Sequence, residues 1–229
     1  MSSTSPFERS HNGGNVPIAA PNAAPLAGRE IIVAVCGGIA AYKAAEVVSK
    51  LTQLGAGVTV VMTAAARKFI APLTFSTLSG RPVLTGTFAK AESVDSQHIA
   101  LTERADLMLV VPATSNLLAK VACGLSDDLV SLTIAASACP VVFAPAMNNR
   151  MWENPIAIEN RAKLAGFGYR FIAPDDGWLA CRNMGPGRLA DPQRIIAEVS
   201  ALLAARRGPG LVKLNDTKSP GETAGTGGD

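Results

Sequence analysis

The chain is poor in aromatic and charged residues and lacks long apolar runs. Of its 229 residues, 5% are aromatic and 17% are charged. Its longest apolar stretches, such as 107–113, fall well short of the roughly 20 residues that a membrane-spanning helix needs. The N-terminal segment also has no apolar core of the signal-peptide kind. Hydrophobic residues make up 48% of the chain, which excludes wholesale disorder and predicts a compact protein. Without a spanning segment or a signal peptide, we expect it in the cytoplasm.

The chain also lacks a strong excess of either charge, and it lacks clusters of metal-ligating residues. Twenty-one basic residues against 18 acidic ones give a net charge of +3, and their scatter is weak ground for nucleic-acid binding. With two histidines and no CxxC pair, no metal site is expected. Three cysteines, Cys36, Cys123 and Cys139, are expected to be small buried residues. The fourth, Cys181, has different surroundings, described below.

The composition divides the chain into a domain with two tails. Residues 1–28 and 207–229 are rich in Gly, Pro, Ser and Thr without an apolar period, which predicts disordered tails around one domain at 29–206. Within the domain, β-branched runs alternate with helical periodicity, which predicts an α/β fold with an open parallel sheet flanked by helices. Strands are expected at 31–35, 58–62, 105–111, 140–144 and 169–172, and helices at 44–54, 114–122, 127–137, 156–164 and 192–205. Thr63 is expected to cap a further helix.

Ligands of such folds bind at the carboxyl edge of the sheet, and two segments there carry suitable residues. Gly37 and Gly38 follow the first strand, so backbone N–H groups at a helix start could hold a phosphate, or the glycines could simply make a tight turn. NAD is disfavoured because the third glycine of its motif is missing and no acidic residue ends the second strand. After the third strand, the run 114–116 (Thr-Ser-Asn) could cap a helix or donate hydrogen bonds to a phosphate or a heterocycle.

Three further features suggest chemistry. Segment 145–155 holds two Met, one Trp and three Asn, which suits a lid over a flat ligand better than a solvated loop. Segment 176–188 is punctuated by glycine and contains Cys181, as in a mobile flap whose thiol donates a proton or acts in redox chemistry. His98 could be structural or a general base.

Taken together, His98, PAMNNRMW (145–152) and LACRNMGPGRLADP (179–192) resemble the homo-oligomeric flavin-containing cysteine decarboxylases, over about residues 29–205. The resemblance implies a Rossmann-like or flavodoxin-like fold and an FMN cofactor. The residues that it implies for FMN are Gly37, Gly38, Ile39, Thr63, Thr114, Ser115, Asn116 and Ala146.

The activity implied by the resemblance is decarboxylation of 4'-phosphopantothenoylcysteine to 4'-phosphopantetheine in coenzyme A biosynthesis. The cysteinyl group is oxidised to a thioaldehyde, carbon dioxide leaves, and the enethiolate is reduced. By the same resemblance, His98 would act as base or charge stabiliser, Asn148 would hold the substrate carboxylate, and Cys181 would supply a proton in the reducing half. Met151 would shape the substrate pocket.

The resemblance also implies a homotrimer or homododecamer, and a phosphopantothenate–cysteine ligase that is either a separate protein or a domain missing from this chain. Two alternatives belong to the same family. A peptidyl-cysteine decarboxylase would have no need of Cys181, and a non-catalytic regulatory subunit would have no use for His98, Asn148 and Cys181 together. The chain departs from the family pattern at Arg182, where many relatives have Gly, and at Leu117, where a small polar residue is common.

Overall fold

The computed structural model describes residues 24–86 and 97–205. Its main sheet has five parallel strands in the order β2-β1-β3-β4-β5. The strands are β1 (Glu30–Val35), β2 (Gly57–Met62), β3 (Leu107–Ala113), β4 (Val141–Pro145) and β5 (Arg170–Phe171). This strand order is that of the flavodoxin-like α/β folds, so the predicted fold class is confirmed.

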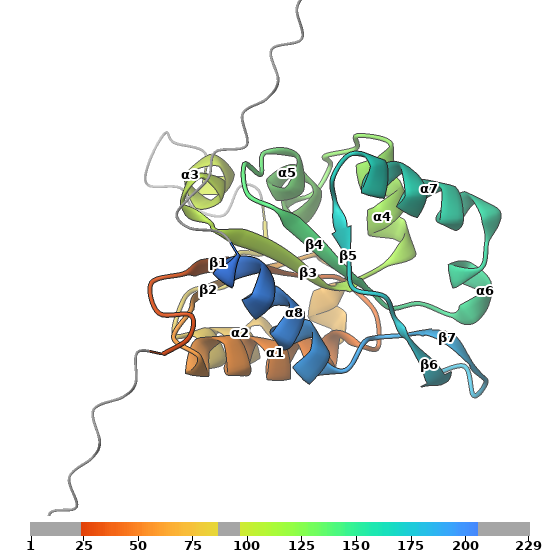
Figure 1. Cartoon of the computed structure of the whole chain (residues 1–229), viewed down its shortest axis with the longest axis horizontal. Coiled ribbons are helices and arrows are strands. Elements are labelled where there is room, and N and C mark those ends of the chain that lie inside the picture. The colour runs from red at the N-terminus through yellow and green to blue at the C-terminus, as the bar shows by residue number, and fades with distance from the viewer. Residues whose placement is uncertain (1–23, 87–96, 206–229) are drawn as a thin grey trace, which may run out of the picture.

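Helices cover both faces of the sheet (Figure 1). One face carries α1 (Ala41–Gln53), α2 (Pro72–Ser79) and α8 (Pro192–Ala204). The other carries α3 (Gln97–Arg104), α4 (Ser115–Ala122), α5 (Leu129–Ala135) and α7 (Pro155–Gly166). No helix within the described ranges is long and apolar enough to cross a membrane.

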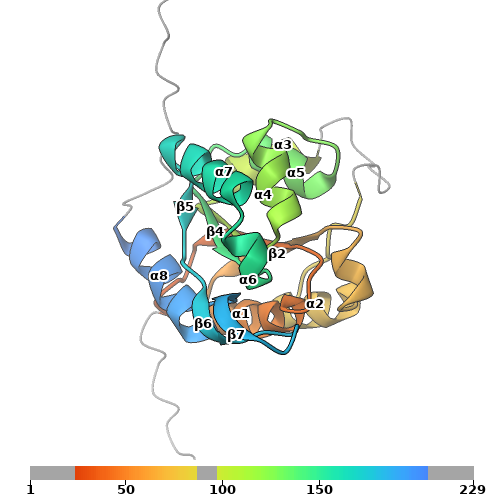
Figure 2. The same cartoon turned by 90° about the vertical axis from the view of Figure 1, so that its right-hand side faces the viewer.

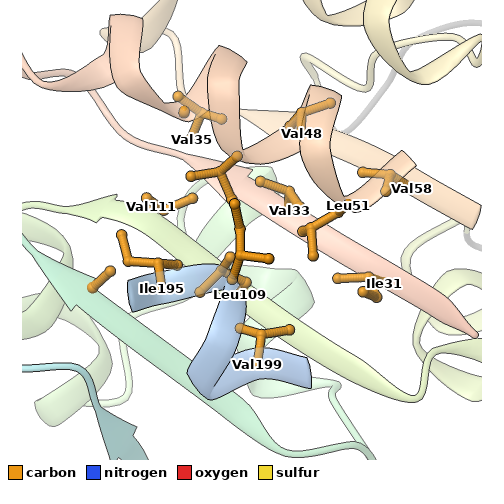
Figure 3. Close-up of a cluster of buried hydrophobic side chains, with 14 of the residues drawn as sticks. Ile31, Val33, Val35, Val48, Leu51, Val58, Leu109, Val111, Ile195 and Val199 are labelled. Carbon is orange, nitrogen blue, oxygen red and sulfur yellow. The ribbon is translucent and has the colours of Figure 1, made fainter. Parts of the chain in front are cut away.

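The strands are apolar on both sides because both sides are covered. Every residue of β3 is buried, and alternate residues point into two hydrophobic clusters. Figure 3 shows the first cluster, in which Leu109 and Val33 lie between α1 and α8. Leu26 is 3% exposed in the same cluster, although it lies before the predicted start of the domain at residue 29. Of the predicted tails, residues 24–28 are described, whereas residues 1–23 and 207–229 lie outside the described ranges.

Several element boundaries differ from those predicted. β3 begins two residues later and ends two residues later than the predicted strand, so it includes Pro112. The helix that Thr63 was expected to cap is only the short 3₁₀ helix η1 (Ala66–Lys68), and its N-cap is Ala65. Thr63 Oγ1 accepts from Ala66 N at 3.1 Å in the turn that precedes it. Helices α2 and α3 were not predicted from the sequence.

Two small elements stand at the carboxyl edge of the sheet, as Figure 2 shows. Helix α6 (Asn149–Trp152) follows β4, in the segment predicted to be a lid loop. The antiparallel hairpin of β6 (Asp175–Trp178) and β7 (Met184–Arg188) forms the segment predicted to be a flap. Asp191 caps α8 immediately after the hairpin, as expected, with its carboxylate accepting from Gln193 N at 2.8 Å.

Candidate active site

A cavity of about 1120 Å³ opens at the carboxyl edge of the sheet. We call the lining residues drawn from 36–43, 63–65 and 112–120, together with Asp128, the sheet wall. Those drawn from 146–151 and 178–189 we call the lid wall. The volume lies just above the roughly 300–1,000 Å³ range of small-ligand pockets, so the cavity is large enough for a ligand of nucleotide size.

The cavity brings together the predicted site residues, with one exception. His98 lies in α3, but its side chain is outside the described part of the structure. The predicted residues that line the cavity are Gly37, Gly38, Ile39, Thr63, Thr114, Ser115, Asn116, Ala146, Asn148, Met151 and Cys181.

The two glycines of the sheet wall serve different purposes. A Cβ on Gly37 would lie 2.4 Å from Ala65 Cβ and 2.7 Å from the Ala65 carbonyl carbon. Gly37 is therefore required for the close packing of two loops, which is the structural interpretation of the motif. A Cβ on Gly38 would meet nothing nearer than Thr114 Cγ2 at 3.8 Å. The space beside Gly38 is thus open toward the cavity, where its backbone can approach a ligand.

Residues 114–116, after β3, suit both roles considered from the sequence, which are capping a helix and donating hydrogen bonds to a ligand. Thr114 is the N-cap of α4, and its Oγ1 accepts from Leu117 N at 3.3 Å. Ser115 and Asn116 form the first turn, where backbone N–H groups lack helical partners. Their side chains make no hydrogen bond within the described residues. They remain available, with the positive end of the helix dipole, for an anion in the cavity.

The lid wall places an amide against a thiol. Asn148 caps α6, with its Oδ1 accepting from Arg150 N at 2.8 Å. This cap fixes the orientation of the side chain, so that Nδ2 faces the hairpin and donates to Cys181 Sγ at 3.0 Å. Cys181 is exposed. The pair joins two segments that are 33 residues apart in sequence.

The hairpin carrying Cys181 has a tight tip and a firm base. Leu179 N donates to Asn183 O at 2.9 Å, and between them Arg182 has a φ of +65°. This left-handed conformation favours glycine, so Arg182 stands at a position where the backbone suits Gly better than Arg. At the base, Gly187 O accepts from Met147 N at 2.9 Å, and a Cβ on Gly187 would lie 2.3 Å from Met147 O. The two parts of the lid wall therefore touch through their backbones.

Basic groups outnumber acidic ones in the lining. Lys43, Lys120 and Arg188 line the cavity with one carboxylate, Asp128. Lys120 Nζ donates to Asp127 at 2.7 Å and to Asp128 at 2.9 Å, and these hydrogen bonds raise the pKa of the ammonium. Burial opposes ionisation of Asp128, but hydrogen bonds from Ser131 N and Lys120 outweigh it and lower the pKa. Arg188 lies 3.8 Å from Asp175, so Lys43 is the lining cation that forms no ion pair within the described residues.

The cysteines differ in their surroundings. Cys36, at the end of β1, is buried against the cavity, and burial raises the pKa of its thiol to about 12. Cys139 is buried, as predicted, whereas Cys123 is exposed, so that prediction was wrong. Cys123 follows α4 as its C-cap, at a helix end that faces solvent. No group of three or more metal-ligating side chains occurs in the described part of the chain.

Sequence reasoning missed several lining residues. Lys43 lies on α1, Lys120 and Asp128 meet from α4 and α5, and Trp178 comes from the hairpin. The period of α4 placed Lys120 on a helix without saying which neighbour it faces. Only the packing of α5 against α4 brings Asp128 to it, and no local pattern encodes that contact.

Comparison with known proteins identifies the family. A family model described as Flavoprotein matches residues 20–204, and the chain belongs to this family. Its relatives include a probable phosphopantothenoylcysteine decarboxylase from Streptococcus mutans, 45% identical over 76% of this chain and 99% of that protein. The coenzyme A biosynthesis bifunctional protein CoaBC of Bacillus subtilis is 44% identical over 75% of this chain and 42% of that protein. The chain thus spans less than half the length of this CoaBC relative.

Solved structures agree with this assignment. A PPC decarboxylase mutant complexed with pantothenoylaminoethenethiol has a TM-score of 0.69 and 28% identity, covering 77% of this chain and 98% of that one. The FMN-dependent cysteine decarboxylase SpaF also has a TM-score of 0.69, with 32% identity over 78% of this chain and 97% of that one. The resemblance found in the motifs is therefore confirmed.

Proposed function

We propose that the chain is an FMN-dependent decarboxylase that converts 4'-phosphopantothenoylcysteine to 4'-phosphopantetheine. The observation that carries this proposal is the hydrogen bond from Asn148 Nδ2 to Cys181 Sγ, at 3.0 Å, in the lining of the cavity of about 1120 Å³. A carboxylate-binding amide and a proton-donating thiol are the groups that decarboxylation followed by reduction requires. The relatives named phosphopantothenoylcysteine decarboxylase and CoaBC support the choice of substrate.

The sheet wall fits FMN. In folds with this strand order, FMN binds where β1 and β3 diverge, and the open backbone at Gly38 and the first turn of α4 meet there. Ser115 and Asn116 would donate hydrogen bonds to the phosphate or to polar edges of the ring. Thr63 and Ala146 would contact the flavin from the ends of β2 and β4. Bound FMN would supply the electron-pair acceptor that oxidises the cysteinyl side chain.

Asn148 would hold the carboxylate of the substrate. Its Oδ1 is occupied by the α6 cap, so Nδ2 is the end of the amide left for other partners. One of the two hydrogens on Nδ2 points to Cys181 Sγ, and the other can donate to a carboxylate. When carbon dioxide leaves, the electron pair moves into the enethiolate of the oxidised substrate. Met151, on the same short helix, would shape the pocket around this group.

Cys181 would donate a proton in the reducing half of the reaction. When the enethiolate is reduced, its carbon–carbon double bond takes up a hydride equivalent and one proton. Cys181 would supply that proton and become a thiolate. The N–H of Asn148 stabilises that thiolate because a hydrogen bond to the charged form favours it. His98 is proposed as the base or charge stabiliser of the oxidising half.

Homo-oligomers are proposed from the exposure of apolar side chains around the cavity. Ile39, Tyr42 and Trp178 are each 61% exposed, Met151 is 47% exposed and Met184 is 69% exposed. A patch of this kind on a monomer marks an interface, and a second copy in a homotrimer or homododecamer would cover it. A phosphopantothenate–cysteine ligase, acting in the same pathway in the cytoplasm, would supply the substrate.

A matched pair of cysteine variants tests the proposal. Both Cys181 and Cys123 are exposed, but only Cys181 lines the cavity. With FMN and 4'-phosphopantothenoylcysteine, Cys181→Ser should release carbon dioxide yet accumulate a product two hydrogens short of 4'-phosphopantetheine. Cys123→Ser should give complete turnover. Mass spectrometry of the products of each variant distinguishes 4'-phosphopantetheine from the product that lacks two hydrogens.

Three outcomes would count against the proposal. An unaffected yield of 4'-phosphopantetheine from Cys181→Ser would remove the role of the thiol. Wild-type turnover of a peptide with a C-terminal cysteine, without turnover of the phosphorylated substrate, would identify a peptidyl-cysteine decarboxylase. Flavin binding without turnover of either substrate would identify a regulatory subunit.

A further inference from the structure

Helix α6 carries two proposed site residues but cannot hold its own position. It has four residues, none of which is buried, and a helix this short is not stable by itself. Asn148 at its N-cap and Met151 within it nevertheless line the cavity. Their placement must therefore come from contacts that α6 makes with the rest of the fold.

One such contact joins α6 to α7 through side chains. Arg161, on α7, lies with its Cζ 3.6 Å from the centroid of the Trp152 ring, at the last residue of α6. Trp is the aromatic side chain that attracts a cation most strongly, and Arg is the cation found most often over such a ring. Helix α7 is itself fixed to the core by Leu164, which is 1% exposed and one turn beyond Arg161.

Arg161 has no other strong partner that would explain its position. It forms no ion pair within the described ranges, and its Nη1 is buried without a hydrogen-bond partner there. Burial lowers the pKa of the guanidinium, which still stays charged at neutral pH. A buried, unpaired N–H costs free energy, and the contact with Trp152 offsets that cost.

We propose that Arg161 is a positioning residue, which clamps Trp152 and thereby holds α6, with Asn148 and Met151, against the cavity. As a statement about catalysis this inference rests on the proposed function. As a statement about α6 it stands on the contacts alone. The clamp acts at the end of α6 opposite to the Asn148–Cys181 hydrogen bond, so the helix is held at both ends.

The test compares Arg161→Met with Lys163→Met, a matched change at an exposed position of the same helix. With FMN-loaded protein and 4'-phosphopantothenoylcysteine, Arg161→Met should lower kcat/KM about tenfold, because small displacements of positioning groups are costly. The loss should lie mainly in KM, since Asn148 is proposed to hold the substrate carboxylate. FMN content should stay at the wild-type level, and Lys163→Met should change neither quantity. Arg161→Lys, which keeps the charge over the ring, should recover part of the loss.

Two physical readouts separate the clamp from a general structural role. In a Trp178→Phe background, Trp152 is the only tryptophan, and its emission should change in Arg161→Met but not in Lys163→Met. Amide hydrogen exchange of residues 149–152 should speed up at least several-fold in Arg161→Met, while β3 stays protected. Adding Arg161→Met to Trp152→Leu should cause no further loss, because both changes remove the same contact.

The outcomes distinguish this inference from the proposed function. If wild-type protein fails to turn over the substrate, the proposed function fails, and the exchange and emission measurements still decide whether the clamp exists. Unchanged exchange and emission in Arg161→Met would overturn the clamp. So would multiplicative losses in the double variant, or an FMN loss that accounts for the whole fall in activity.

Discussion

The two walls of the cavity are built in different ways. The sheet wall continues directly from buried strands, and residues such as Val35 and Val111 just before it are 0% exposed. The lid wall consists of a four-residue helix without buried residues and a hairpin whose Trp178 and Met184 are mostly exposed. Apart from Ala146, the groups proposed for cofactor binding lie on the sheet wall. Asn148, Met151 and Cys181, proposed for substrate and proton handling, lie on the lid wall, whose elements are held by few contacts. Such elements belong to the less stable end of a fold, where movement during a reaction is possible.

The largest difference between the two regions should appear on truncation of an apolar side chain. Leu109→Ala should destabilise the fold by about 2–5 kcal/mol, because it opens a cavity between α1, α8 and the sheet. Met184→Ala, at a side chain that is 69% exposed, should change stability by less than about 0.5 kcal/mol. Urea unfolding of the two variants measures both. Equal losses would show that the hairpin is as firmly packed as the sheet.

Next in size is the contrast between the thiols of the two walls. Cys36 is buried with a pKa of about 12, whereas Cys181 is exposed. Iodoacetamide at pH 8 should modify Cys181 at least about 100-fold faster than Cys36. The thiolate is the reactive form, and Cys36 is both protonated at this pH and inaccessible to the reagent. Peptide mapping measures the two rates, with Cys123 as an exposed reference. Comparable modification of Cys36 in the folded protein would contradict the buried placement.

The smallest effect concerns the ion pair of the sheet wall. Because the pKa of Asp128 lies below its ordinary value of 3.8, its charge stabilises the fold above that pH, and this stabilisation is lost as the pH falls through the folded-state pKa. Asp128→Asn keeps a capping oxygen but not the charge, so it should cost about 1 kcal/mol at pH 7. The difference should vanish once the pH has fallen below the folded-state pKa of Asp128, where both proteins are uncharged at this position. Acid titration of unfolding in both proteins checks this, and a pH-independent difference would refute the electrostatic cause.

The sequence predicts the sheet wall better than the lid wall, for physical reasons. Buried parallel strands are continuous β-branched runs, and Thr114 and Asp191 mark helix starts, so these elements could be identified locally. Helix α2 buries only Phe75 and Ser79 and shows no clear apolar period. The hairpin strands consist largely of Gly, Asp, Pro and Arg, which do not favour strands. The hydrogen bond from Met147 N to Gly187 O joins the hairpin to the segment after β4, and no local pattern reveals that contact.

The same division applies to the site. Residues that follow strands were found because carboxyl ends of parallel strands meet at one edge, and their roles came from the family motifs. Lys120, Asp128 and Arg161 were missed, because their importance arises from contacts between separate helices. The position of Cys123 was predicted wrongly for a related reason. Cysteine is usually buried, but a helix end pointing to solvent overrides that tendency.

The most direct test of the account is an anaerobic incubation of the wild-type protein with FMN and 4'-phosphopantothenoylcysteine, with the visible flavin spectrum and the product mass recorded together. The account predicts loss of one carbon dioxide, formation of 4'-phosphopantetheine, and oxidised flavin at the end of turnover. A yellow protein that leaves this substrate unchanged would contradict it.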